Sequence, residues 1–133
     1  MPLREEIERA FVKFKAEDGG DISAEFAVPP ADSALFAGHF PDAPVLPGVC
    51  LLQCVLAAIS KAGGKHASLV SVSKARFNSA VFPGDTVLVT GRPSWNGDDV
   101  TGKFALSKQS EENGGSAEKV ASVALAARTG SFN

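Results

Sequence analysis

The stretch "FAGHFPDAPVLPGVCLLQCVLAAI", residues 36–59, joins a proline-rich segment to an apolar run that only Gln53 interrupts. Pro47 precedes the run and a glycine pair at 63–64 follows it, which is the usual placing of proline and glycine around a helix. The residues from Pro47 to about Lys61 therefore predict a helix. Because this helix is apolar on nearly all sides, we expect it to be buried.

The segments on either side of this helix carry the pattern of strands. Before it, Phe11 to Ala16 and Asp21 to Val28 flank the turn sequence "EDGG" and predict a hairpin. A one-turn helix is expected at Asp32 or Ser33. Four further strands are predicted at residues 68–81, 85–95, 100–109 and 119–132. One buried helix and about six strands, joined mostly by hairpins, indicate the α+β class, with an antiparallel sheet wrapped around the helix.

Length and composition restrict the class of protein. A chain of 133 residues predicts a single domain, residues 1–133. The net charge of -2 gives no general attraction to nucleic acid or to an anionic membrane. The start of the chain lacks the apolar core of a secretion signal, and no apolar run is long enough to span a membrane. Cys50 and Cys54 are too few for a zinc site and are expected to be buried, so we expect a cytoplasmic protein without a metal.

Two motifs resemble a known family. The stretch "GHFPDAPVLPGV", residues 38–49, resembles the signature of the hotdog-fold 3-hydroxyacyl-ACP dehydratases of bacterial type II fatty acid synthesis. The stretch "KARFNSAVFPGDTVLV", residues 74–89, resembles the region of that family in which a basic and aromatic pair precedes a Pro-Gly-Asp turn. The resemblance implies a hotdog fold and the dehydration of a (3R)-hydroxyacyl thioester to a trans-2-enoyl thioester.

The resemblance also implies which residues carry the chemistry. The histidine of the family motif is catalytic, and this role carries over to His39. The family places a carboxylate fourteen positions later, where this chain has Gln53. An imidazole can act as a base near neutral pH, and the free backbone N–H groups of Gly48 and Val49 can stabilise negative charge on the thioester oxygen.

Gln53 is the main departure from the family pattern. Its amide can hydrogen-bond a hydroxyl group or hold a water molecule, but it cannot deliver a proton as a carboxylic acid does. Three outcomes stay open: His39 performs both proton transfers, another acid has taken over, or the activity is very weak. Taken alone, Gln53 also fits a core amide that backbone groups satisfy, and His39 fits a structural loop residue.

Further residues are assigned on the same resemblance. Phe40, Phe77 and Phe82 are predicted to line an acyl tunnel, although strand aromatics often belong simply to the core. Lys74 and Arg76, and also Lys61 and Lys65, are candidates to meet the acidic surface of an acyl carrier protein. The alternative for these four is an ordinary solvated face.

The resemblance implies no metal or redox cofactor. It implies a substrate presented on the phosphopantetheine arm of an acyl carrier protein or of coenzyme A. Two other functions stay open: a hotdog acyl thioesterase, and a non-catalytic acyl-binding subunit of a dehydratase heterodimer. We also expect a homodimer or a trimer of dimers, in which His39 and Gln53 of one site come from different protomers.

Overall fold

The computed structural model describes residues 3–29, 48–109 and 117–130, without the side chains of residues 3–6. Within these residues the chain forms two helices and seven strands. In chain order they are α1 (Leu3–Ala10), β1 (Phe11–Ala16), β2 (Ile22–Ala27), α2 (Gly48–Gly63), β3 (Ala67–Phe77), β4 (Thr86–Gly91), β5 (Ser94–Asn96), β6 (Asp99–Gln109) and β7 (Glu118–Thr129).

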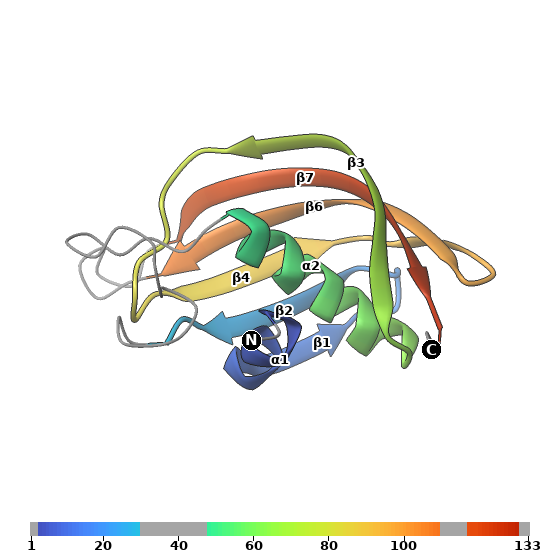
Figure 1. The fold of residues 1–133 in the computed structure, drawn as a ribbon, viewed down its shortest axis with the longest axis horizontal. Coiled ribbons are helices and arrows are strands. Elements are labelled where there is room, and N and C mark those ends of the chain that lie inside the picture. The colour runs from blue at the N-terminus through green and yellow to red at the C-terminus, as the bar shows by residue number, and fades with distance from the viewer. Residues whose placement is uncertain (1–2, 30–47, 110–116, 131–133) are drawn as a thin grey trace.

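All described strands form one antiparallel sheet. Six strands follow the order β1-β2-β4-β6-β7-β3, and the short β5 pairs with β6. The sheet curves around α2, which lies along its concave face, and α1 packs against α2 and β2 (Figure 1). The predicted α+β class, with an antiparallel sheet wrapped around one buried central helix, is therefore confirmed.

The two ends of α2 follow from the residues beside them. Pro47 precedes the helix in the sequence, and Gly64 follows it with a φ of +70°. The Gly64 N–H donates to the Ser60 carbonyl at 2.9 Å. This hydrogen bond is typical of a helix that ends at a left-handed glycine. The Ser60 hydroxyl also accepts the Ala67 N–H at 2.9 Å and ties the helix end to the start of β3.

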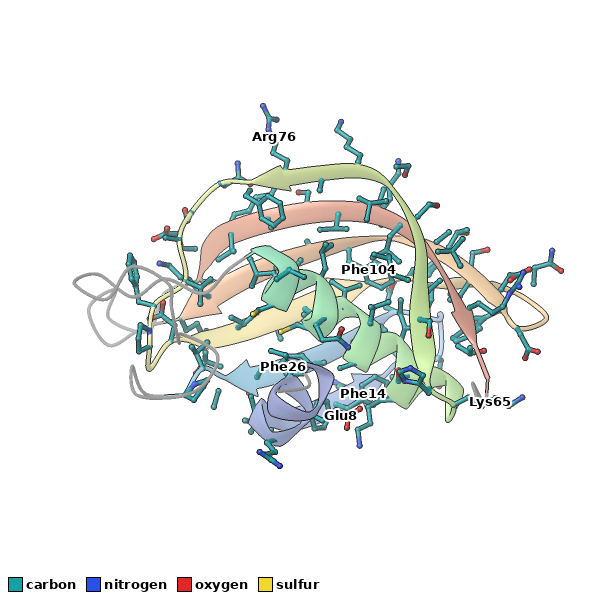
Figure 2. All side chains as sticks on the ribbon, in the orientation of Figure 1. Glu8, Phe14, Phe26, Lys65, Arg76 and Phe104 are labelled. Carbon is teal, nitrogen blue, oxygen red and sulfur yellow. The ribbon has the colours of Figure 1, made fainter. Side chains whose placement is uncertain are left out.

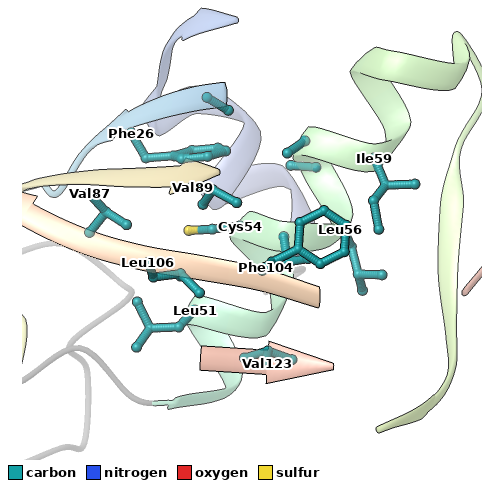
Figure 3. Packing of buried hydrophobic residues seen from close by; sticks show 14 of the residues in the cluster. Phe26, Leu51, Cys54, Leu56, Ile59, Val87, Val89, Phe104, Leu106 and Val123 are labelled. Carbon is teal, nitrogen blue, oxygen red and sulfur yellow. The ribbon is translucent and has the colours of Figure 1, made fainter. Parts of the chain in front are cut away.

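The core of the protein is the contact between α2 and the concave face of the sheet. Val55, Ala58 and Ile59 on the helix have no exposed surface, and they share one hydrophobic cluster with inward-facing strand residues such as Val87 and Leu106 (Figure 3). A large aliphatic side chain buried in this way stabilises a fold by roughly 1.5 to 3 kcal/mol. Residues from α1 to β7 contribute to this cluster, which therefore holds the described elements together.

Two glycines make room for the largest side chain between β4 and β6. Phe104 is buried, and a Cβ atom added to Gly91 would lie 2.5 Å from its ring. A Cβ atom added to Gly102 would lie 2.9 Å from the same ring. The ring therefore lies directly on the backbone of both strands, a position that any larger residue at 91 or 102 would obstruct.

The two edges of the sheet differ in character. The β1 edge is short, carries Lys13 and Lys15 and contains a bulge, three features that discourage pairing with another chain. The β3 edge is eleven residues long, and almost all of its side chains are exposed. Its exposed large apolar residues are Leu69, Val70, Val72 and Phe77. This edge is therefore the one that favours pairing with a further strand.

Three expectations from the sequence need correction. The prediction of a single strand at 85–95 is wrong, because the chain leaves the sheet at Arg92 and Pro93. This segment therefore forms two strands, β4 and β5. Proline has no N–H group to donate to a neighbouring strand. The described residues accordingly form seven strands rather than about six. Helix α1 was not predicted, although Leu3, Ile7 and Ala10 recur at helical spacing.

Other expectations agree with the structure or lie outside it. The hairpin before α2 is confirmed as β1 and β2. The helix predicted from Pro47 to about Lys61 is confirmed as α2 from Gly48 onward, and Pro47 lies outside the described residues. The one-turn helix expected near Asp32 lies outside the described residues. No helix in the described ranges is long and apolar enough to cross a membrane.

Candidate functional site

The first turn of α2 is an accessible helix start. The backbone N–H groups of Gly48 and Val49 have no carbonyl partner within the helix, and Val49 is 58% exposed. The first turn carries no acidic residue that would offset the positive end of the helix dipole. This end of the helix can therefore stabilise an oxygen that gains negative charge, such as the carbonyl oxygen of a thioester.

Phe77 lies against this helix start. A Cβ atom added to Gly48 would lie 3.1 Å from the Phe77 ring, closer than ordinary van der Waals contact. Phe77 is the last residue of β3 and is half exposed. The structure therefore brings Gly48 and Phe77 together, and the absence of a side chain at position 48 is what lets the ring approach the helix backbone.

Gln53 lies one helical turn after Val49, on the same face of α2. Its side chain is partly buried, whereas the next residue, Cys54, is fully buried. Among the described residues, no hydrogen-bond partner of the Gln53 amide is found, and no amide atom of Gln53 is sealed off from solvent. A core amide satisfied by backbone groups would have such a partner. The geometry thus leaves the amide available to a ligand or to water.

Two of the predicted site residues cannot be placed. His39 and Phe40 fall in the range 30–47, outside the described residues, so the spacing between His39 and Gln53 stays a sequence argument. Phe82 is described: it lies in the turn between β3 and β4 and is 45% exposed. The turn joins the C-terminal end of β3, which also carries Phe77.

Lys74 and Arg76 lie on the opposite face of β3 from Phe77. Successive residues of a strand point to opposite faces, and Arg76 projects away from α2 (Figure 2). The structure therefore places these two cations on the convex face of the sheet and not at the helix start. Across the sheet, Lys74 and Lys103 both align with Ala124 of β7, one from each side.

A groove runs over this part of the convex face. It has a volume of about 430 Å³, and its lining includes Lys74, Lys103, Ser122, Ala124 and Thr90. Neither lysine forms an ion pair with a described residue. The sequence analysis did not include Lys103 among the candidate cations. Its alternation with the buried Phe104 and Leu106 nevertheless assigns it to the outer face of the sheet.

The other candidate cations lie at the far end of α2. Lys61 stands 4.9 Å from the centre of the Phe11 ring, and Lys65 forms an ion pair of 3.6 Å with Asp98. Together with His66 these lysines line a cavity of about 460 Å³ near the C-terminal end of the helix. Both lysines are therefore engaged within the protein, in contrast to Lys74 and Lys103.

The two thiols of α2 are unsuited to nucleophilic chemistry. Cys50 and Cys54 are both buried and both free. Burial raises the pKa of Cys50 to about 11, and burial together with the neighbouring Cys50 also raises the pKa of Cys54. Neither forms the reactive thiolate near neutral pH. Within the described ranges, no three histidine, cysteine, aspartate or glutamate residues gather in a way that could hold a metal ion.

Known dehydratases share sequence with this chain. Residues 14–118 match the family model of the ApeI-like proteins, described as ApeI dehydratase. The 3-hydroxyacyl-[acyl-carrier-protein] dehydratase FabZ of Ehrlichia chaffeensis is 35% identical over 60 residues, which cover 41% of this chain and 42% of that protein. FabZ of Thermus thermophilus is 41% identical over 64 residues, covering 42% and 45%. The matches thus span less than half the length of these relatives.

Solved structures share the fold of this chain. The ApeI:P dehydratase heterocomplex from Xenorhabdus doucetiae has a TM-score of 0.69 at 17% identity, covering 89% of this chain and 96% of that one. An acyl-CoA hydrolase from Staphylococcus aureus, solved with butyryl coenzyme A, has a TM-score of 0.57 at 15% identity, covering 86% and 68%. These likenesses confirm the predicted hotdog fold. Because the family model spans most of the sequence, the chain belongs to the ApeI-like dehydratase family.

Proposed function

We propose that this protein dehydrates (3R)-hydroxyacyl thioesters to trans-2-enoyl thioesters, in fatty acid synthesis or a related lipid or polyketide pathway. Membership of a dehydratase family, matched over residues 14–118, carries this proposal. The exposed start of α2 supports it, and so does the amide of Gln53 one turn further along the helix, for which no partner is found among the described residues. An elimination of water needs no metal or redox cofactor.

The reaction assigns one role to each group. His39 removes the proton from the carbon next to the thioester carbonyl, and the negative charge that develops on the carbonyl oxygen is stabilised by the N–H groups of Gly48 and Val49. The amide of Gln53 orients the departing hydroxyl group. Because that amide cannot supply a proton, His39 returns the proton it has removed, and the hydroxyl leaves as water.

Two exposed aromatic rings are proposed to line the acyl path. Phe77 covers the helix start, and Phe82 lies in the turn that follows the same strand. Both rings are about half exposed in the single chain, so an acyl group or a second protomer can bury them. Phe40 belongs to the same proposal through its place in the family motif.

Two other functions compete with dehydration. The structural likeness to an acyl-CoA hydrolase supports a thioesterase, in which Gln53 positions the attacking water. The likeness to a chain of a dehydratase heterocomplex supports a non-catalytic acyl-binding subunit, which would explain the missing acid at position 53. The products formed from one substrate separate all three functions.

The exposed β3 edge supports assembly with a second copy. Its eleven residues offer unpaired backbone groups and four large apolar side chains, and Phe77 at its end borders the helix start. We infer a homodimer in which two β3 strands meet across a two-fold axis, with trimers of such dimers as the larger form. The partner protomer then supplies His39 to the site that contains Gln53.

Three cations on the convex face support delivery of the substrate on a carrier protein. Lys74, Arg76 and Lys103 share this face, and none of them forms an ion pair with a described residue. Lys61 and Lys65 are engaged at the other end of α2 and are therefore weaker candidates. We infer that an acidic carrier surface docks over Lys74 and Arg76.

The remaining inferences concern the chain as a whole. Core residues run from Ile7 to Ala127 in one hydrophobic cluster, which supports a single domain over residues 1–133. Assignment to the cytoplasm stays a prediction from the sequence.

The first test is a product assay with a short 3-hydroxyacyl thioester, in which enoyl absorbance and free thiol are followed together. We expect enoyl product without thiol release. His39→Ala should lower the rate by about 10² to 10⁴, because that is the usual contribution of one positioned base. Thiol release would identify a thioesterase, and acyl binding without turnover would identify a non-catalytic subunit.

The second test replaces Gln53 with glutamate, which keeps the length of the side chain and restores the carboxyl group of the family. Its partly buried position raises the pKa of the new carboxyl, which favours the protonated form that an acid needs. We expect faster dehydration and little change in melting temperature. A less stable protein with no gain in rate would remove Gln53 from the site.

The third test concerns the dimer. Val70→Lys places a charge on the β3 edge, and Val12→Lys places the same charge on the β1 edge, where Val12 is similarly exposed. We expect light scattering to show a dimer for the wild type and for Val12→Lys, and a shift toward monomer for Val70→Lys. A monomeric wild type that is active at micromolar concentration would contradict the assembly.

The fourth test concerns the carrier surface. Lys74→Glu with Arg76→Glu should raise KM for a carrier-bound substrate by about ten-fold, as expected for losing close charge pairs. KM for the same acyl group on coenzyme A should not change. Lys13→Glu with Lys15→Glu, on β1, is the matched control. Equal effects on both substrates would place the two cations outside a carrier-specific surface.

A further inference from the structure

Lys108 is a buried charged side chain that the proposed reaction does not use. It lies near the C-terminal end of β6, and its side chain is 8% exposed. Its ammonium donates to the Ala80 carbonyl at 2.5 Å and lies 3.7 Å from the equally buried carboxylate of Asp85. The same ammonium lies 4.8 Å from the centre of the Phe82 ring. Three groups of the short segment 80–85 thus converge on one cation.

The carboxylate that Lys108 meets also holds the backbone of the turn. The Asp85 N–H donates to the Phe82 carbonyl at 3.1 Å, and Pro83 and Gly84, with a φ of +88° at Gly84, complete a type II turn. In addition, the Phe82 N–H donates to the Asp85 carboxylate at 2.9 Å. Lys108 therefore acts on Phe82 twice, through the face of its ring and through the carboxylate that holds its N–H.

The turn is joined to the end of β2 as well. The Val28 N–H donates to the Asp85 carbonyl at 2.8 Å, and the Gly84 N–H donates to the Val28 carbonyl at 3.1 Å. In Figure 1 the ends of β2, β3 and β6 and the start of α2 all lie at the same end of the molecule. The turn that Lys108 contacts thus lies at the same end of the molecule as the start of α2.

A buried ion pair is by itself weak evidence of a contribution to stability. Burying an ammonium and a carboxylate costs desolvation energy, and apolar residues of similar volume often hold a fold equally well. An apolar pair, however, offers no acceptor for the Phe82 N–H and no cation for the face of its ring. The ion pair thus provides two contacts to Phe82, a hydrogen bond to its N–H and a cation over its ring, and both favour one position of that ring.

We propose that Lys108 is a positioning residue that sets the place of the Phe82 ring and, through it, the length of acyl chain that the protein accepts. This rests on the proposed function, in which Phe82 lines the acyl path. Lys108 does not touch the acyl chain, because its ammonium is covered by Ala80, Asp85 and Phe82.

The test needs a variant that folds without the ion pair. Lys108→Met alone leaves the Asp85 carboxylate buried and unpaired, which is strongly destabilising. Lys108→Met combined with Asp85→Asn leaves no unpaired charge, and the introduced amide oxygen can still accept the Phe82 N–H. The matched control is Arg128→Met combined with Asp99→Asn, which removes an exposed ion pair of 2.8 Å between β6 and β7.

Two readouts follow, and neither requires turnover. The first is hydrogen exchange at the amides of Val28, Phe82 and Gly84. The second is calorimetric binding of S-butyl and S-decyl pantetheine, which contain the arm common to carrier protein and coenzyme A. In the double variant we expect faster exchange and roughly four-fold weaker binding of the decyl ligand, the equivalent of losing contact with about one methylene group. Binding of the butyl ligand and all properties of the control should not change.

A folded double variant with unchanged affinity for the decyl ligand would overturn the proposal, whatever its exchange rates. Equal weakening of both ligands would also overturn it, because that result indicates a general structural role. Failure of the wild type to bind the decyl ligand would contradict both the acyl path and the proposed role of Lys108. A wild type that binds this ligand selectively but does not dehydrate its substrate refutes only the proposed function.

Discussion

The burial of α2 in the curved sheet is the constraint on which the other features depend. The helix is held at a fixed rotation because Val55, Ala58 and Ile59 are fully enclosed by the sheet. A rotation by one residue, about 100°, would bring the Gln53 amide to the place of the enclosed Cys54, in apolar surroundings. An amide buried without a partner is costly, so the same packing that forms the core also keeps Gln53 facing the open side.

The fold also connects the helix start to the end of β3. Gly48 has no side chain, so the Phe77 ring can lie against the first turn, and the turn after β3 brings Phe82 to the same end of the molecule. The Phe77 ring thus lies against the helix start, and the turn that carries Phe82 lies at the same end of the molecule.

The sequence predicted the elements whose signals are local. The helix α2 was predictable because proline and glycine bound an apolar run, and the hairpin of β1 and β2 because "EDGG" interrupts two strand-like segments. The division between β4 and β5 was not predictable, because one proline in a strand-like pattern leaves open whether the strand ends or only bends. Helix α1 was missed because its apolar residues are few and charges surround them.

The candidate site was predictable to a lesser extent. Periodicity places Gln53 and Val49 on one helix face, and the family motif singles out His39, but only the fold shows that Phe77 lies against Gly48. The ion pair between Lys108 and Asp85 joins residues far apart in the chain, and no local pattern in either segment predicts it. Such long-range pairs depend on the order of strands in the sheet, which the sequence alone did not provide.

The two buried thiols give the protein a built-in reporter of its own motion. Cys50 and Cys54 lie on the enclosed face of α2, and burial holds both in the unreactive protonated form. A thiol reagent reaches them only when the first half of the helix separates from the sheet. The rate of labelling therefore measures how often the helix opens, and Cys50, in the first turn, senses the mobility of the helix start itself.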